Sequence, residues 1–273
     1  MTKSTAPEDF LRAFHAERPA VTAEALGPGR APDGRSSYQL LCDEVAGYRR
    51  VLDLGCGDGL LLELLARDEG RLLAGVDLSP ESLAAARRRP APAGARLAVA
   101  RAQELPFADG GFDACVSHLA LMLMNEIDQV AAEIARVLAP GGLLACAVGG
   151  GPVGGEAFER FGRLLRRAVD EAPASSRVPS LGDRRTRSRA GLEEVLRPVG
   201  FGPVRWRSVP IDLGGPVARV WDSLSGFYEL GPLDAATVAR LREDFFADVA
   251  DLTTPEGTVP CGFTVHLASA RLR

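Results

Sequence analysis

The sequence contains a single lysine, Lys3, although it has 273 residues and 25% of them are charged. A phosphate-binding Walker loop needs a Gly-Lys-Ser/Thr segment, so the scarcity of lysine excludes that class of nucleotide-binding protein. The formal net charge of −4 provides no general basic field, and this acidic balance argues against a nucleic-acid partner.

Paired cysteine motifs are also absent. The five cysteines are scattered, none forms a CxxC pair, and Cys115 and Cys146 fall inside apolar runs. An odd and dispersed set is typical of buried thiols in a reducing compartment, rather than of disulfides or a zinc site. The three histidines come from distant segments without ligand spacing, so we expect no metal site.

Long hydrophobic runs are missing as well. No stretch approaches the roughly 18 apolar residues that a membrane span requires. The first 20 residues lack the long apolar core of a signal peptide, and 46% hydrophobic residues is ordinary for a globular protein. We therefore expect a soluble cytoplasmic protein without a membrane partner.

Strand and helix patterns alternate regularly from residue 48 to residue 148. Five apolar runs predict strands: "VLDL", "RLLAGVDLSP", "ARLAVARAQELPF", "GFDACVSHLAL" and "LLACAV". Between the last two runs, apolar residues recur at helical spacing, namely Ile127, Val130, Ala131, Ile134 and Val137. Such alternation implies right-handed βαβ units and a parallel sheet covered on both faces.

The stretch "VLDLGCGDG" (residues 51–59) places three glycines at the end of the first strand. Gly55, Gly57 and Gly59 permit positive φ and let a ligand approach the backbone closely. The loop lacks the G-x-G-x-x-G spacing of a dinucleotide site, and Asp58 would repel a pyrophosphate. It favours a cationic or zwitterionic ligand, whereas a tight turn that binds nothing is the alternative.

A second acid, Asp77, ends the second predicted strand, 22 residues after Gly55. In nucleotide-binding α/β folds an acid at this place accepts hydrogen bonds from both ribose hydroxyls. A carboxylate suits that task because two neighbouring donors must be satisfied at once. The alternative role, capping the next helix, is better filled by Ser79, which directly precedes Pro80.

Four motifs together resemble the class I S-adenosylmethionine-dependent methyltransferases, in particular the small-molecule branch that includes ubiquinone and menaquinone methyltransferases. They are "VLDLGCGDG", "GVDLSP", "AQELPFADGGFDACVS" and "EIARVLAPGG", in this order, within residues 45–148. The resemblance implies S-adenosylmethionine as cofactor and S-adenosylhomocysteine as product. The second half of the chain resembles the family only through a helix ending in "GF" and two further strands.

The resemblance implies a fold class of α/β with a Rossmann-like, seven-stranded sheet, mostly parallel with the last strand antiparallel. Helices would cover both faces, and a helical cap would stand over the carboxyl edge. We expect an N-terminal helical segment over the cofactor (1–46), a cofactor-binding core (47–148) and a third part that completes the sheet (149–273). Insertions at 149–187 and 212–258 would form a lid over the acceptor.

The family's functional residues map onto the first two motifs. The acid ending the first strand and the first two loop glycines border the methionine part of the cofactor, which corresponds to Asp53, Gly55 and Gly57, with Cys56 between them. The ribose-binding acid corresponds to Asp77, and Leu78 would pack on the adenine.

The third motif departs from the family's "D-A-E-x-L-P-F" pattern, because Arg101 replaces the acid that reads the adenine amine. Ala102 would contact the adenine through its backbone, and Gln103 would offer an amide oxygen to the amine. Ser117 and His118, at the end of the fourth strand, would lie under the methyl-transfer position.

His118 is the candidate catalytic residue, because ligands bind at the carboxyl end of open α/β sheets and histidine titrates near neutral pH. It would contact the acceptor or accept its proton, and the alternative is that it merely lines the pocket. We expect His15 to lie on the surface and His266 to be packed or hydrogen-bonded.

Two other groups leave alternatives open. Five cap aromatic residues would shape the acceptor site or form the core of the cap: Phe158, Phe161, Trp221, Phe227 and Tyr228. The arginines of "GDRRTRSR" suggest a solvated loop, an anchor for an acidic substrate or an RNA contact.

The sequence thus predicts an S-adenosylmethionine-dependent methyltransferase acting on a small molecule, as a monomer or homodimer. Acidic metabolites and natural-product intermediates are the candidate acceptors, and the target atom (O, N or C) stays open. The alternatives are an RNA or protein methyltransferase, or a cofactor-binding protein of this fold with a non-methylating role.

Overall fold

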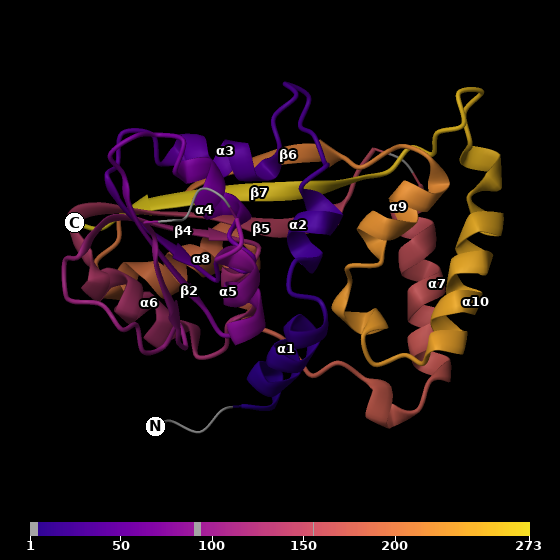
Figure 1. Ribbon diagram of the computed structural model, residues 1–273, viewed down its shortest axis with the longest axis horizontal. Coiled ribbons are helices and arrows are strands. Elements are labelled where there is room, and N and C mark those ends of the chain that lie inside the picture. Colours follow the sequence, from indigo (N-terminus) through magenta and orange to yellow (C-terminus); the bar gives the residue numbers. More distant parts are fainter. Residues whose placement is uncertain (1–4, 90–93, 155) are drawn as a thin grey trace.

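A computed structural model describes residues 5–89, 94–154 and 156–273. Its centre is a seven-stranded sheet in the order β3-β2-β1-β4-β5-β7-β6 (Figure 1). The strands are β1 (Arg50–Leu54), β2 (Leu72–Asp77), β3 (Arg96–Val99), β4 (Phe112–His118), β5 (Leu138–Pro152), β6 (Arg205–Asp212) and β7 (Gly262–Arg271). Strands β1 to β5 pair in parallel, and β7 runs antiparallel to both β5 and β6.

The sheet carries helices on both faces because its central strands are apolar on both sides. Within β1, Val51 and Leu52 point to opposite faces and belong to separate hydrophobic clusters. The helices of the first face are α3 (Ser37–Glu44), α4 (Leu60–Leu65) and α5 (Pro80–Ala86). Those of the second are α6 (Ile127–Val137) and α8 (Arg189–Leu196). The predicted Rossmann-like fold class is confirmed, including the reversed last strand.

Two N-terminal helices, α1 (Ala6–Glu17) and α2 (Val21–Leu26), lie between the sheet and the cap (Figure 1). Helix α1 contacts α5, and α2 contacts α9 (Val217–Leu224) of the cap. Helix α2 is short, and its apolar residues Val21, Ala23 and Ala25 are buried. Residues 1–4 of this segment, Lys3 among them, lie outside the described residues.

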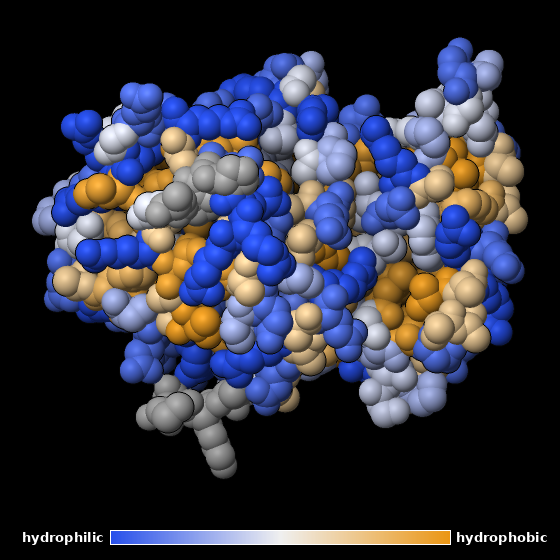
Figure 2. All heavy atoms as spheres, viewed as in Figure 1, coloured by the Kyte–Doolittle hydropathy of each residue, from blue (hydrophilic) through white to orange (hydrophobic). Residues whose placement is uncertain are grey.

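The cap consists of α9 together with α7 (Ala157–Glu171) and α10 (Ala235–Asp248). Its interior is aromatic: Phe161 packs against Trp221, Phe227 and Phe245 with ring centroids 5.7–6.0 Å apart. Three arginines of α7 pair with acids of α10 or its following turn, namely Arg160 with Asp251, Arg163 with Asp248 and Arg167 with Asp244. The view in Figure 2 shows apolar side chains of the cap reaching its surface over these helices.

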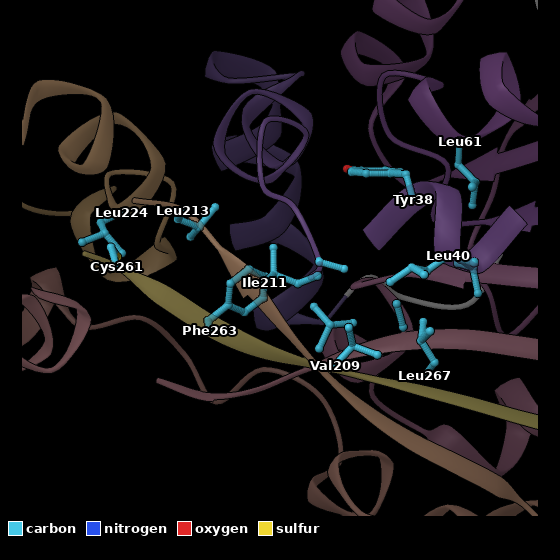
Figure 3. Close-up of a cluster of buried hydrophobic side chains, with 14 of the residues drawn as sticks. Tyr38, Leu40, Leu61, Val209, Ile211, Leu213, Leu224, Cys261, Phe263 and Leu267 are labelled. Atoms are coloured by element: carbon cyan, nitrogen blue, oxygen red, sulfur yellow. The ribbon is translucent and has the colours of Figure 1, made fainter. Parts of the chain in front are cut away.

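The core of the sheet continues into the cap without a break. Figure 3 shows this cluster running from Tyr38, Leu40 and Leu61 along β6 and β7 to Leu224 of α9. Strands β6 and β7 extend beyond the sheet's centre and carry apolar residues at their cap ends, such as Ile211 and Phe263. The cap is therefore seated on the sheet through buried apolar surface.

The remaining short turns are 3-10 helices. They are η1 (Leu121–Leu123), η2 (Ala174–Ser176), η3 (Arg184–Arg187), η4 (Arg197–Val199), η5 (Tyr228–Leu230) and η6 (Ala250–Leu252).

Strand β5 begins at Leu138, earlier than the expected start at residue 143, and extends beyond 148 to Pro152. No helix within the described ranges is both long and apolar enough to cross a membrane.

Replacing Phe161 with Ala tests the cap core. The side chain is 1% exposed and touches three other aromatic rings, so its loss should lower the free energy of unfolding by about 3–5 kcal/mol. Urea denaturation measures this value. The matched control is Phe246→Ala. Because Phe246 is only partly buried, its replacement should lower the free energy of unfolding by about 1 kcal/mol. Equal losses of unfolding free energy in both variants would contradict the placement of Phe161 at the centre of the cap's core.

Candidate active site

The glycine loop after β1 adopts the backbone that its glycines permit. Gly55, Gly57 and Gly59 have φ of 75°, 52° and 81°, which is the left-handed region that side chains disfavour. A Cβ on Gly55 would lie 2.4 Å from that of Ala120, whereas one on Gly57 would meet nothing within 4 Å. Gly55 thus lets the loop pass the segment after β4, and Gly57 leaves bare backbone beside open space.

Asp77 ties this loop to the end of β2. Its Oδ2 accepts a hydrogen bond from the Gly57 N–H at 2.8 Å, and its Oδ1 accepts one from the Ser79 N–H at 2.9 Å. Burial raises the pKa of Asp77, although these two hydrogen bonds act in the opposite direction. A carboxylate has about four lone-pair sites, so two remain for the hydroxyls of a ligand.

Most N–H groups of the glycine loop are hydrogen-bonded within the protein. The N–H groups of Gly55 and Cys56 both donate to the Val76 carbonyl, and that of Gly59 donates to the Cys56 carbonyl. The Cys56 side chain is buried, and its sulfur packs against Gly75. Cys56 therefore faces the site through its backbone alone.

Asp53 is a buried acid at the end of β1 and is 1% exposed. Its Oδ2 has no hydrogen-bond partner among the described residues. Burial raises the pKa of Asp53 well above its usual range, and the neighbouring carboxylates of Asp77 and Asp58 raise it further. A cationic ligand would supply both the missing partner and the missing countercharge.

Asp58 is held by Arg89, a residue that the sequence reading did not identify. The Arg89 guanidinium donates to the Asp58 carboxylate, to the Asp58 carbonyl at 2.7 Å, and to Glu63 at 2.8 Å. Three consecutive arginines, residues 87–89, follow α5 and suggest an acidic partner. Their positions in the sequence do not indicate which loop that partner lies on. Asp58 therefore acts as an anchor of the glycine loop.

Two adjoining cavities open at the carboxyl ends of β1, β2 and β4. Asp77 and Gly55 line both, together with His15, Ala120 and Leu123. The first cavity also contains Leu78, Ala102 and Gln103. The second also contains Asp53, Cys56, Gly57 and His118. Nine of the ten predicted site residues thus come together, because these strands are neighbours in the sheet.

Ser117 is the tenth predicted residue and lines neither cavity. It is fully buried; its hydroxyl donates to the Leu54 carbonyl at 2.8 Å and accepts from the Leu121 N–H at 3.1 Å. In a strand, neighbouring side chains face opposite sides, so Ser117 and His118 cannot both face the same cavity. The Ser117 hydroxyl instead joins β1 to the turn that follows β4.

The first cavity is roofed by α1. Arg101 lies at this rim, where its guanidinium pairs with Glu8 of α1 at 2.8 Å and with Glu126 at 3.0 Å. Gln103 donates through its side chain to the Asn125 carbonyl at 2.9 Å. The arginine that replaces the family's acid therefore holds the N-terminal helix against the loop after β3.

His118 lines the second cavity in a constrained setting. Its Nε2 lies 2.9 Å from the Ser37 hydroxyl, and the Tyr38 ring stacks on the imidazole with centroids 3.7 Å apart. Its Nδ1 is buried and has no hydrogen-bond partner within the described part of the chain. Burial lowers the pKa of His118 to about 3, so the ring is neutral at neutral pH.

His15 was expected at the surface, and that expectation is wrong. It lines both cavities, and its Nε2 lies 3.2 Å from the Tyr228 hydroxyl. Burial lowers the pKa of His15, and Asp77 opposes that shift. Its place depends on α1 folding back over β2, which the local sequence of α1 does not reveal.

The five cap aromatics divide into two groups. Tyr228 lines the second cavity and packs against Phe14 of α1, with ring centroids 4.7 Å apart. The other four line neither cavity; they pack together as part of the cap. His266 is hydrogen-bonded to Ser208 at 2.9 Å and packs on Trp206, as predicted.

The arginine run lies over the second face of the sheet. Arg185 pairs with Asp183 and Asp128, and Arg189 pairs with Glu193. Gly182 comes so close to Met122 that a Cβ would lie 2.0 Å from the Met122 carbonyl oxygen. This loop therefore braces the turn after β4, and neither of its paired arginines reaches the two cavities.

The described side chains contain no group of three or more His, Cys, Asp or Glu residues that could hold a metal ion. The site instead combines buried acids, a neutral histidine and a bare glycine loop. Together with the sheet order, these features define the class: a Rossmann-like protein that binds a nucleoside-containing ligand at its carboxyl edge.

Comparisons with known proteins identify the family. Residues 52–146 match the model of a methyltransferase domain. The chain is 33% identical over 219 residues to trans-aconitate 2-methyltransferase of Methylobacterium nodulans, an alignment covering 78% of this chain and 81% of that protein. The chain therefore belongs to the class I S-adenosylmethionine-dependent methyltransferase family, as its motifs predict.

Other relatives match over shorter parts of the chain. Methyltransferase GfsG of Streptomyces halstedii is 40% identical over 108 residues, which are 38% of this chain and 39% of GfsG. Fatty-acid O-methyltransferase of Mycolicibacterium smegmatis is 39% identical over 95 residues, which are 34% of this chain and 35% of that enzyme. The alignments thus span less than half of these two relatives.

A solved structure shares the fold along nearly the whole chain. The [4+2]-cyclase SpnF superposes with a TM-score of 0.59 at 21% identity, covering 98% of this chain and 97% of that one. The likeness extends beyond the core to the N-terminal helices and the cap, so the whole architecture is a known variant of this fold.

Replacing Asp53 with Asn removes the buried carboxylate and keeps its shape. Because the pKa of Asp53 is raised in the folded protein, the unfolded chain loses its proton first as the pH rises above about 4. Asp53 therefore contributes a decrease in the free energy of unfolding as the pH rises, until the folded group also ionises. The lowered pKa values of His118 and His15 contribute an increase up to about pH 6.5.

We expect Asp53→Asn to raise the free energy of unfolding at pH 8 by about 1–3 kcal/mol. The gain of the variant over the wild type should be larger at pH 8 than at pH 5, and cofactor binding should weaken. Urea titrations of both proteins at both pH values check this, and an equal difference between them at the two pH values would contradict it.

Replacing Arg89 with Met leaves the buried Asp58 without its cation. We expect the affinity for S-adenosylhomocysteine to fall about tenfold, which corresponds to roughly 1.4 kcal/mol, because the glycine loop loses its anchor. Calorimetry measures this affinity. The control is Arg88→Met, a neighbouring exposed arginine; a loss of similar size there would indicate a general charge effect.

Proposed function

We propose that the protein transfers the methyl group of S-adenosylmethionine to a small-molecule acceptor bound in the second cavity. The observation that carries this proposal is the joining of the two cavities at Asp77 and Gly55. A nucleoside in one cavity would then present its reactive end in the other. Transfer of an activated methyl group mainly requires alignment and exclusion of water.

The residues present fit the cofactor. Asp77 has lone-pair sites left for the ribose hydroxyls, and Leu78, Ala102 and Gln103 surround the space for the adenine. The unpartnered Oδ2 of Asp53 suits the ammonium group of the methionine part. Bound there, S-adenosylmethionine supplies a methyl group on a sulfonium sulfur, which leaves as a neutral thioether.

We further propose that the acceptor is a carboxylic acid that becomes a methyl ester. Two relatives are named for such acids, trans-aconitate and fatty acids. The second cavity supports the idea because burial lowers the pKa of both its histidines, His15 and His118. Burial also raises the pKa values of its tyrosines, Tyr38 and Tyr228. A carboxylate needs no base, since it is ionised at neutral pH.

The acid-rich second cavity disfavours acceptors with several negative charges. Its lining contains Asp53, Asp58 and Asp77, and no arginine or lysine of the described ranges belongs to it. A single carboxylate beside a sulfonium cation would be neutralised there, whereas further carboxylates would lack a countercharge. This argument favours a monocarboxylic acid with an apolar body over a tricarboxylate.

Calorimetry with S-adenosylmethionine tests the cofactor assignment. Wild-type protein should bind, and Asp77→Ala should weaken binding at least about tenfold, because two vicinal hydroxyls lose their acceptor. Equal affinities would contradict the assignment.

Radiolabelled S-adenosylmethionine with decanoate, trans-aconitate or bulk RNA as acceptors tests the reaction. We expect label transfer to decanoate above trans-aconitate, recovered as methanol after alkaline hydrolysis, the behaviour of an ester. Label on RNA, with binding that weakens steeply as salt rises, would favour the RNA alternative instead. Cofactor binding without transfer to any acceptor would favour a non-methylating role.

We propose that the protein acts in the cytoplasm as a monomer or homodimer. In this arrangement α1, which lines both cavities, and α2 and Tyr228, which line the second, form the lid and move to admit the acceptor.

A further inference from the structure

We infer that Ser37 fixes His118 as a neutral donor whose Nδ1–H holds an oxygen of the methyl acceptor, so that His118 binds the acceptor instead of deprotonating it. Ser37 is in this view a positioning residue, and His118 is the acceptor-binding one. The acceptor contact rests on the proposed function, whereas the assignment of the tautomer does not.

The geometry confines His118 to one orientation. The Ser37 hydroxyl lies 2.9 Å from Nε2, and the Tyr38 ring lies over the imidazole at an interplanar angle of 21°. Ser37 and Tyr38 are consecutive residues of α3, whose first turn is fixed by Ser36 through a capping box with Gln39. A rigid helix end thus supplies both contacts, and the direction of Nδ1 follows from them.

Hydrogen-bond accounting selects the tautomer. Ser37 is fully buried, and its hydroxyl is hydrogen-bonded to Nε2 of His118. If Nε2 carried the hydrogen, the buried hydroxyl hydrogen and the Nδ1 lone pair would both lack partners. If Ser37 donates to Nε2, only the Nδ1–H lacks one. Because each buried unpaired polar group is costly, the second arrangement is favoured.

An oxygen of the ligand would satisfy that remaining donor. His118 belongs to the lining of the second cavity, where the described neighbours with ionisable groups are Asp53, Asp58, Asp77, Cys56, His15, Tyr38 and Tyr228. Burial lowers the pKa of His118 to about 3, so its ring is neutral at neutral pH and has one N–H to donate.

The donor role suits a carboxylate acceptor. One oxygen would accept the Nδ1–H bond, and the other would form the bond to the methyl carbon with an electron pair that it already carries. The carbon–sulfur bond breaks as this bond forms, and no proton leaves the acceptor. A histidine acting as base would have no proton to remove in such a reaction.

Long-range proton–nitrogen correlation spectra of histidine-labelled protein test the tautomer directly. Wild-type His118 should show the Nδ1–H form at pH 7 and remain neutral at pH 5. Ser37→Ala should shift the ring toward the Nε2–H form, with S-adenosylhomocysteine binding retained. An Nε2–H form in the wild type, or a cation forming near pH 6, would overturn the inference whether or not the protein transfers methyl groups.

Kinetics with decanoate distinguish a donor from a base. We expect a flat kcat/KM between pH 6 and pH 9, with His118→Asn, whose amide keeps an N–H at the position of Nδ1, retaining at least about a tenth of it and His118→Ala losing about 100-fold. A rate that rises with pH in the wild type, together with an inactive His118→Asn, would overturn the donor role.

The chain offers a matched control in its second serine–histidine pair. The Ser208 hydroxyl lies 2.9 Å from Nδ1 of His266 at the edge of the sheet, away from both cavities. Ser208→Ala should leave the His118 spectrum and the pH profile unchanged. If the wild type transfers no methyl group to decanoate, the proposed acceptor is wrong, and the tautomer is still decided by the spectra.

Discussion

One carboxylate, that of Asp77, joins the two turns on which the site depends. It accepts the N–H of Gly57 from the loop after β1 and the N–H of Ser79 at the start of α5. The acid at the end of β2 thus helps to hold the left-handed backbone of the glycine loop, together with the Val76 carbonyl and Arg89. The same carboxylate lines both cavities, so the element that holds the loop together also faces the ligand.

Around this point the protein concentrates buried charge that it does not neutralise. Asp58 has Arg89 as a partner, but Asp53 has an unpartnered oxygen and a raised pKa. Such a group destabilises the folded chain at neutral pH and becomes favourable when a cation arrives. The site therefore gives up stability for ligand binding, a trade that is common where function depends on a buried charge.

Helices from three parts of the chain close the site. Helix α1 is held by the ion pair of Arg101 with Glu8 and by the contact of His15 with Tyr228, and the cap rests on an aromatic core around Phe161. Phe14 adds an aromatic contact between α1 and Tyr228, and the sheet beneath is a continuous apolar core (Figure 3). Opening of α1 thus breaks local contacts without disturbing the sheet.

The sequence by itself predicted the parallel core of the sheet and the cluster of candidate site residues at its carboxyl edge, because strand period, glycine spacing and acids at strand ends are local patterns. The reversed last strand was implied by the resemblance to the family, and the structure confirms it. Asp53, Gly57 and Asp77 lie at the ends of neighbouring strands in a known strand order, so their meeting follows from topology.

Only the tertiary structure decided the rest. Three site contacts join residues that are far apart in the sequence. His15 lies near Asp77, which is 62 residues away. Arg89 bonds Asp58, 31 residues away, and Ser37 bonds His118, 81 residues away. No local pattern encodes such pairings, since they depend on how α1, α3 and α5 pack. Ser117 shows the converse: beside His118 in sequence, it faces the other side of β4 because successive side chains of a strand alternate.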